Sequence, residues 1–297
     1  MTIQNAAVRQ TDLPETRVGS WGQLVWHQLT RNRGAVAGGT IFALLALAAV
    51  LAPLVAPHDP IEIAAGAAME APSLAHPMGT DPMGRDIFSR VIFGGRISLR
   101  LGLISVSIAA VTGGLIGLVS GYYGGLIDNV IMRLIDMLLA FPSILLALII
   151  LYSIGPGLNN AMIAVGISSI PQYARVIRGS TLSAKEETYV DAACAIGCRN
   201  LRIMVRHILP NVVGPLVVLA TLSLASAVMS IAGLSFIGLG AEPPNPEWGV
   251  MLSTGRDYLR NAWWMSVFPG LAISVTVLAV NLLGDGLRDA LDPRMKG

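Results

Sequence analysis

Charged residues are scarce in this sequence: Asp, Glu, Lys and Arg together fill 13% of its 297 positions. A soluble globular domain carries about 25% charged residues, so this chain has too few to cover a surface that faces water. Hydrophobic residues fill 54% of the positions, and the mean hydropathy is +0.65. We therefore expect an integral membrane protein in contact with lipid. The small net charge of +2 gives no reason to expect a nucleic-acid partner.

Cysteine is also scarce, and the two that are present, Cys194 and Cys198, exclude a disulfide framework. At this spacing they could share one face of a helix, but His207 lies well beyond them and no further cysteine completes a set of metal ligands. Small packing residues in a reducing compartment are the favoured interpretation, and no metal site is predicted.

Catalytic motifs are missing as well. The sequence has no Gly-x-x-x-x-Gly-Lys-Ser/Thr phosphate loop, no Gly-x-Ser-x-Gly elbow and no His-Glu-x-x-His helix. We therefore predict no catalytic residue and no cofactor bound by this chain.

Long apolar runs are abundant. A helix that crosses the roughly 30 Å hydrocarbon core needs about 20 apolar residues. Five segments meet this need, and a sixth, at 161–170, is short; the predicted spans are 35–56, 99–120, 134–152, 161–170, 212–232 and 263–283. The first run begins too far from Met1 and is too long for a cleaved secretory signal, so a signal-anchor helix is expected. Pro142 is predicted to kink the third span.

The distribution of basic residues supports six crossings with both termini in the cytoplasm. In this arrangement 14 of the 20 Lys and Arg residues lie inside, in agreement with the positive-inside bias. If 161–170 did not cross, the basic stretch 175–206 would face outward and the bias would be lost. Six arginines remain outside, and four of them crowd into a short stretch: Arg85, Arg90, Arg96, Arg100, Arg256 and Arg260.

Glycines recur every four residues at the end of the second span, at Gly113, Gly117, Gly121 and Gly125. This spacing predicts a flat helical stripe that another helix can approach closely.

Polar groups within the spans are few and are candidates for a substrate pathway. They are Asn281 in the sixth span and Ser223 and Ser226 in the fifth, although a serine hydroxyl commonly bonds its own helix backbone. Asp136, near the start of the third span, is expected to pair with Arg133.

The segment between the fourth and fifth spans is predicted to contain a short helix over 185–196, with Gly197 just past its end. Arg199, Arg202 and Arg206 then follow at helical spacing along one face. Such a segment could dock a cytosolic partner or be held by anionic lipid, and its physical properties alone favour neither.

Asp191-Ala192-Ala193, Gly197 and Leu209-Pro210 resemble, in their spacing, the EAA loop of type I ABC importer permeases, with Asp191 where that family usually has Glu. Further stretches are similar to the C-type permeases of dipeptide, oligopeptide and nickel importers. They are Gly79-Thr80-Asp81 with Gly84-Arg85-Asp86, the glycine-rich and proline-rich run 233–249, and the ending 281–293. The resemblance covers roughly 25–297.

The resemblance implies an all-α polytopic fold of six transmembrane helices, the type I ABC importer permease fold, in a bacterial inner membrane. The chain is then divided into a cytoplasmic tail (1–24), a first transmembrane helix with a periplasmic segment (25–97), an ABC transmembrane core (98–288) with its coupling loop at 175–210, and a cytoplasmic C-terminal tail (289–297).

The resemblance also implies partners: a second permease subunit, two ABC ATPase subunits that bind ATP and Mg, and an extracytoplasmic substrate-binding protein. Asp191, Ala192, Ala193 and Gly197 are the expected ATPase contacts, with Arg199, Arg202, Arg206 and Pro210 as further candidates.

The expected cargo is a dipeptide or oligopeptide, and a nickel chelate or glutathione is the alternative. An ion-coupled secondary transporter is the competing class. It would need an ionisable residue near the bilayer midplane, whereas the centres of the six predicted spans lack Asp, Glu, His, Lys and Arg.

Overall fold

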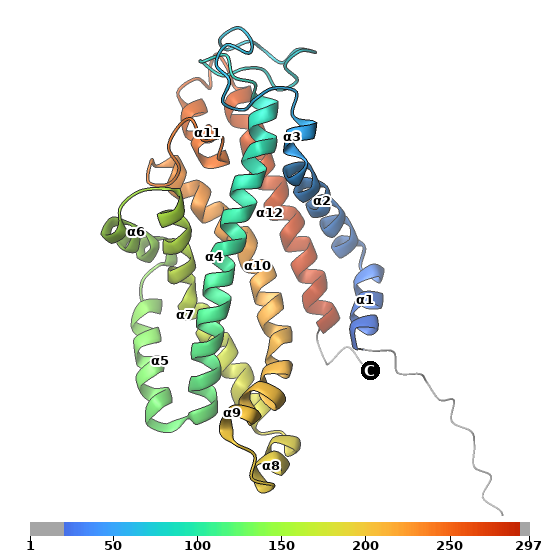
Figure 1. The fold of residues 1–297 in the computed structure, drawn as a ribbon, viewed down its shortest axis with the longest axis vertical. Helices are drawn as coiled ribbons and strands as arrows, with labels where there is room; N and C mark the ends of the chain where they lie inside the picture. The colour runs from blue at the N-terminus through green and yellow to red at the C-terminus, as the bar shows by residue number, and fades with distance from the viewer. Residues whose placement is uncertain (1–20, 292–297) are drawn as a thin grey trace, which may run out of the picture.

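The computed structural model describes residues 21–291, and within this range the chain is helical apart from loops and one isolated bridge between Thr80 and Asp86. The longest helices run along the long axis of the molecule (Figure 1). The predicted tails fall largely on 1–20 and 292–297, outside the described residues. Residues 21–24, which were assigned to the N-terminal tail, begin α1 (Trp21–Arg31).

Four helical stretches are long and apolar enough to cross a membrane. They are α2 (Arg33–Val50), α4 (Ile87–Tyr123), Asn200–Phe236, which ends in α10 (Leu209–Phe236), and α12 (Trp264–Leu291). The first, second, fifth and sixth predicted spans coincide with these helices. The first helix ends earlier than the predicted span 35–56, because α2 ends at Val50 and a single separate turn, α3 (Ala52–Val55), follows it.

Helix α4 begins well before the predicted span at 99–120. Asp86 caps its N-terminus, where the carboxylate accepts a hydrogen bond of 2.8 Å from the backbone N–H of Ser89. At about 1.5 Å per residue the 37-residue helix is roughly 55 Å long, which exceeds the hydrocarbon core of a bilayer. It therefore connects the membrane-spanning bundle with structure beyond the bilayer.

The third predicted span, 134–152, is not one kinked helix. The chain forms α5 (Gly125–Leu139) and α6 (Ser143–Ile154), which meet at an angle of 94°. Pro142 has no N–H to continue a helix and restricts the preceding residue, Phe141, to extended conformations, so the chain breaks there. The predicted position of the disruption is correct, but the prediction of a single crossing helix is wrong.

The short fourth segment, 161–170, lies inside α7 (Leu158–Lys185), an uninterrupted helix of 28 residues that includes Pro171. This helix is long enough to cross a bilayer, but its second half carries Arg175 and Arg178 and it is not among the apolar helices named above. The all-helical membrane fold is thus confirmed, whereas the count of six crossings stays a prediction.

Close packing of α4 on α7 uses three of the four predicted glycines. A Cβ atom at Gly113, Gly117 or Gly121 would lie 2.6, 2.5 or 2.8 Å from atoms of Tyr173, Ala174 or Thr181 on α7. Gly125 does not belong to this stripe, because α4 ends at Tyr123 and Gly125 starts α5 with a φ of +56° and no atom within 4 Å of an added Cβ. Without side chains at the three other positions, the two backbones approach as closely as the spacing predicted.

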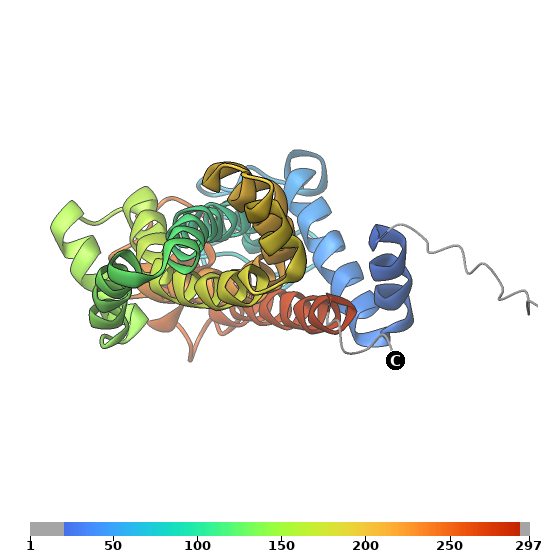
Figure 2. The same cartoon turned by 90° about the horizontal axis from the view of Figure 1, so that it is seen from below.

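The bundle has two distinct ends and two distinct sides (Figures 1 and 2). Helix α8 (Thr188–Ala195) lies at one end, and α11 (Trp248–Arg256) and the loop 57–86 lie at the other. Helices α1 and α2 flank α12 on one side, and α5 and α6 lie on the opposite side. We refer to these ends as the α8 end and the α11 end.

Candidate functional site

The segment 186–208 at the α8 end contains α8, the single turn α9 (Asn200–Ile203) and a π-helical turn, η1 (Met204–Ile208), which leads into α10. Helix α8 ends at Ala195, and Gly197, two residues further on, has a φ of +78°. The N–H groups of Gly197 and Cys198 donate to the carbonyl oxygens of Cys194 (3.0 Å) and Ala193 (3.1 Å), which is the Schellman pattern. The predicted role of Gly197 as the helix terminator is confirmed. The predicted start is wrong, because Lys185 still belongs to α7 and the chain breaks at Glu186.

The residues predicted to contact an ATPase do not all face outward. Asp191, Ala192 and Gly197 are exposed, and an added Cβ at Gly197 would meet no atom within 4 Å. Ala193 is instead buried at 4% exposure in an apolar cluster with Val190. Ala193 therefore packs α8 against the rest of the chain, whereas Asp191, Ala192 and Gly197 remain accessible to a partner.

Both basic and apolar side chains extend from the same segment. Arg199, Arg202 and Arg206 are exposed, as is Pro210 in the first turn of α10. Ile196 and Leu201 are exposed at 80% and 68%. Large apolar side chains beside cations form a surface suited to a protein partner.

Hydrogen bonds fasten this segment to the long helices. The Lys185 ammonium donates to the carbonyl oxygen of Tyr122 (2.8 Å), and the Tyr122 hydroxyl donates to Oδ1 of Asn200 (3.0 Å). Asn211 on α10 donates to the hydroxyl of Tyr189 on α8 (2.9 Å). These hydrogen bonds connect α8 and the turn after it with the ends of α4 and α10.

Two ion pairs join α5 to α7. Arg178 donates to both carboxylate oxygens of Asp128, at 2.6 and 2.5 Å, and the Ser120 hydroxyl donates to the same carboxylate at 2.5 Å. Arg175 pairs with Asp136. The prediction that Asp136 pairs with Arg133 is wrong. The partner is Arg175, which α7 brings to that carboxylate from a distant part of the sequence. Asp128 and Arg178 were not singled out from the sequence, although an acidic residue between apolar helices was a signal for an ion pair.

A cavity of about 480 Å³ lies among α5, α6, α7 and α10. Ser223 and Ser226 both line it, beside polar groups of α7 that the sequence did not single out: Ser168, Ser169 and Gln172. The remaining walls are largely apolar, and none of the lining residues is charged. Asn281 does not line this cavity; it is exposed on α12.

Buried polar residues stabilise the α11 end and account for two of the four arginines crowded into the predicted outer segment. Arg85 forms an ion pair of 2.5 Å with Asp81, and both side chains are only 6% exposed. Arg90 lies 3.9 Å from the same carboxylate and donates to the carbonyl oxygen of Pro60 (2.8 Å). These two cations therefore hold the loop on α4, whereas Arg96 and Arg100 are exposed.

Glu247, which caps α11, is an acidic group of this region with 0% exposure. Burial raises the pKa of the Glu247 carboxyl above its ordinary value of 4.5, although hydrogen bonds from the backbone N–H groups of Gly249 and Val250 and from the Ser235 and Ser98 hydroxyls partly oppose this. The Val250 N–H lies 3.0 Å from the carboxyl group. This buried acid positions α11 beside α4.

Comparisons with known proteins give a consistent result. Residues 113–297 match the family described as binding-protein-dependent transport system inner membrane component, and residues 20–76 match the N-terminal TM domain of oligopeptide transport permease C.

Curated relatives match over nearly the whole chain. A dipeptide transport system permease protein of Alkalihalophilus pseudofirmus is 44% identical over 95% of this chain and 92% of the relative. A di/tripeptide transport system permease protein of Pseudomonas aeruginosa is 45% identical over 91% of each chain. A glutathione transport system permease protein of Escherichia coli is 47% identical over 92% of this chain and 90% of the relative.

Among solved structures, an inward-facing conformation of the MetNI methionine ABC transporter matches with a TM-score of 0.56. The identity is 19%, and the match covers 68% of this chain and 96% of the other. At this identity the likeness concerns the fold alone.

Proposed function

This chain belongs to the family of binding-protein-dependent transport system inner membrane components, and from this premise we propose that it forms half of a channel that imports peptides across a bacterial inner membrane. The observation that carries the substrate class is the 44–45% identity to dipeptide and di/tripeptide permeases over more than nine tenths of the chain. The glutathione permeases are compatible with the same class, because glutathione is itself a tripeptide.

The cavity among α5, α6, α7 and α10 is the proposed section of the pathway. Its uncharged hydroxyl and amide groups, including Ser223, Ser226 and Gln172, can exchange hydrogen bonds with a passing peptide backbone without holding any one side chain. Tight binding would slow release, so weak and unspecific contacts are what a pathway requires. Asn281 remains a candidate only for another part of the route.

A second permease subunit is proposed to complete this pathway from the side of α5 and α6. That side carries exposed apolar side chains on both helices, among them Leu126 (79%), Val130 (54%), Leu145 (48%) and Ile149 (53%). A neighbouring subunit and membrane lipid together would cover this surface.

The α8 end is the proposed docking site of one partner ATPase, and the second permease subunit would bind the other. Asp191, Ala192 and Gly197 present a small, exposed surface, and Arg199 and Arg202 flank it with positive charge. ATP and Mg would be bound by those partners, and this chain would only transmit their movement, through Tyr122 and Asn211, to α4 and α10.

The α8 end is proposed to face the cytoplasm, with both termini on the same side. The positive-inside count supports this orientation. The α11 end, with the loop 57–86, would then receive the substrate-binding protein on the outer face. The family description, a binding-protein-dependent system, supports such a partner.

Transport by the reconstituted complex tests the proposal. Proteoliposomes that contain this chain and its partner subunits should take up labelled di- and tripeptides only when the ATPases are supplied with ATP and the binding protein is on the opposite side. Dissipation of ion gradients should leave the uptake unchanged. Uptake that needs an ion gradient and no ATP would establish the competing class, and uptake of a nickel chelate but not of peptides would contradict the substrate class.

A further inference from the structure

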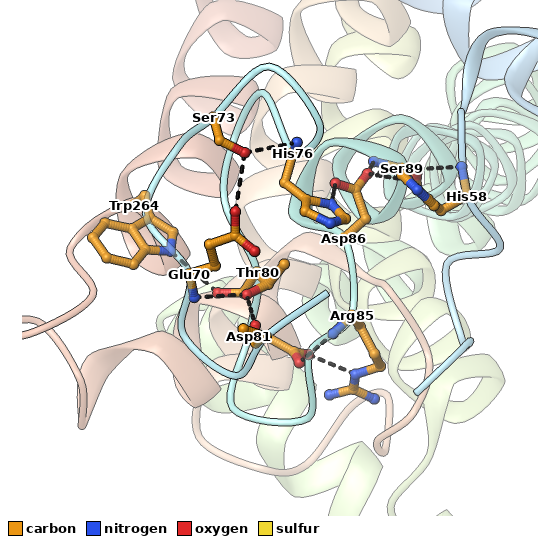
Figure 3. Close-up of polar contacts among 11 residues, drawn as sticks. His58, Glu70, Ser73, His76, Thr80, Asp81, Arg85, Asp86, Ser89 and Trp264 are labelled. Carbon is orange, nitrogen blue, oxygen red and sulfur yellow. Dashed lines mark hydrogen bonds and ion pairs between the residues drawn. The ribbon is translucent and has the colours of Figure 1, made fainter. Parts of the chain in front are cut away.

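Two histidines and one aspartate gather at the α11 end. His58 follows the first membrane-spanning helix, and His76 and Asp86 belong to the loop that leads into α4. Their candidate ligand atoms all lie within 4.8 Å of one another. Figure 3 shows the two imidazole rings and Ser89 around the carboxylate of Asp86.

Each of the two imidazoles has a nitrogen close to the carboxylate of Asp86, as in a metal site built from two histidines and one aspartate. Nδ1 of His76 lies 2.9 Å from Oδ1 of Asp86, and Nδ1 of His58 lies 3.9 Å from Oδ2. In a tetrahedral zinc site with bonds of about 2.0–2.2 Å, neighbouring ligand atoms are about 3.3–3.5 Å apart. One observed separation is shorter than this value and the other is longer. The shorter one is a hydrogen bond between His76 and Asp86, which a bound ion would replace.

The carboxylate is held in place by a second layer of hydrogen bonds. Oδ2 of Asp86 accepts from the backbone N–H of Ser89 (2.8 Å) and from its hydroxyl (2.7 Å), and the backbone N–H of His58 donates to the same hydroxyl (3.2 Å). Such support of ligands by fixed neighbours is typical of metal sites. Asp86 is 0% exposed and His76 is 4% exposed, so two of the three groups are already desolvated.

The third group is incompletely satisfied. Among residues 21–291, Nδ1 of His58 is buried and has no hydrogen-bond partner, and its ring is tilted by 32° to that of His76 with the centroids 4.9 Å apart. A buried, unpaired ring nitrogen beside a buried carboxylate costs stability unless a cation or a proton lies between them. The His58 side chain is 29% exposed, which leaves a route for an ion and room for a water molecule as a fourth ligand.

We propose that His58, His76 and Asp86 bind one divalent transition-metal ion, with Zn²⁺ as the representative, and that this ion ties the loop 57–86 to the start of α4. Two imidazoles and a carboxylate favour zinc and its neighbours over Ca²⁺ or Mg²⁺, which prefer shells of oxygen. The proposed ion is structural, and it is independent of the identity of the transported substrate.

Zinc titration of the full-length chain in lipid nanodiscs tests the proposal, with a purification tag that lacks histidine and prior removal of metals by EDTA. The wild type should retain about one Zn²⁺ per chain by elemental analysis, and Zn²⁺ should raise its apparent melting temperature by about 4 °C or more. Ca²⁺ at the same concentration should have no effect.

Variants of His58 give the sharpest comparison, because Nδ1 of this imidazole makes no hydrogen bond to a described residue and loss of the ring should leave the metal-free protein intact. His58→Ala should bind Zn²⁺ at least about 10-fold more weakly and should lose the thermal shift. His58→Phe, which keeps a ring beside His76 but offers no ligand atom, should behave in the same way. His207→Ala, at the α8 end, is the matched control and should bind like the wild type. Equal binding by the wild type and both His58 variants, or no binding by the wild type, would overturn the proposal.

Discussion

Arg178 on α7 and Asp128 on α5 form a two-pronged ion pair, in which Nε and Nη2 of the arginine lie 2.6 and 2.5 Å from the two carboxylate oxygens. The Ser120 hydroxyl from α4 donates to the same carboxylate, so one acidic group joins three helices close to the segment 186–208. Paired charge-assisted hydrogen bonds of this kind fix the orientation of both side chains. The junction thereby connects the proposed docking site to the helices that line the cavity.

Removal of either partner should weaken this junction. We expect Asp128→Asn and Arg178→Gln each to lower the apparent melting temperature by several degrees, because each leaves a polar or charged partner unpaired. The double variant should lose less than the sum of the two single losses, since the two residues share one interaction. Thermal unfolding in detergent, followed for all four proteins, measures this coupling, and strictly additive losses would show that the pair contributes nothing.

Gly117 should tolerate no side chain. An added Cβ would lie 2.5 Å from the carbonyl oxygen of Ala174, so Gly117→Ala must push α4 away from α7. The expected cost is about 1–3 kcal/mol, seen as a lower melting temperature and a smaller folded yield. Gly114→Ala is the control on the same helix, because its Cβ would meet Leu216 at an ordinary 3.7 Å. Equal stability of the two variants would contradict the close contact.

The sequence predicted those features that depend on local pattern. Apolar length indicated the helices predicted at 35–56, 99–120, 212–232 and 263–283, and glycine spacing indicated that another helix packs closely on α4. The end of α8 just before Gly197 could also be predicted, because the positive φ that follows a helix terminus favours glycine.

Features that depend on tertiary structure were missed or misjudged. The angle of 94° between α5 and α6 is far larger than the kink predicted at Pro142, and both helices pack against α7, which the sequence does not reveal. The partner of Asp136 was assigned to its own helix, because sequence spacing reveals only neighbours along one helix. Ala193 was expected to face a partner, but it packs in the apolar cluster with Val190 instead. The residues of the proposed metal site, His58, His76 and Asp86, are too far apart in sequence to form a recognisable motif.

A bulky residue in the cavity should block transport without harm to folding. Ser226 is exposed and lines the cavity, so Ser226→Trp should reduce peptide uptake at least about 10-fold while the amount of protein in the membrane stays the same. Ser274→Trp on α12, also exposed but outside the cavity, should retain uptake. Uptake assays in cells with matched expression compare the two. Normal uptake by Ser226→Trp would remove this cavity from the pathway.

Stability should depend on pH through Glu247, which lies outside the membrane-spanning helices. Because burial raises the pKa of its carboxyl in the folded protein, the folded state binds the proton more tightly than the unfolded state does. This tighter proton binding stabilises the folded protein. The contribution is fully present at pH values below the ordinary pKa of 4.5 and is lost as the pH rises above it.

Glu247→Gln keeps an acceptor for the Val250 N–H and removes the titration, so its advantage in melting temperature over the wild type should grow between about pH 5 and pH 8. Glu242→Gln, at an exposed position in the same loop, is the control and should follow the wild type. A constant difference between Glu247→Gln and the wild type across this range would show that the buried carboxyl does not titrate there.

The proposed coupling through α8 is tested most directly by two glycines that share a backbone conformation and differ in location. Gly197 at the α8 end and Gly238 at the α11 end have φ values of +78° and +83°, and an added Cβ at either would meet no atom within 4 Å. Leucine at either position therefore introduces similar strain within the chain.

The measurement is the amount of ATPase subunit that co-purifies with each variant from membranes, together with substrate-stimulated ATP hydrolysis. We predict that Gly197→Leu inserts normally but loses the bound ATPase and the stimulation, whereas Gly238→Leu keeps the bound ATPase. Wild-type levels of bound ATPase and of stimulated hydrolysis in Gly197→Leu would contradict the account.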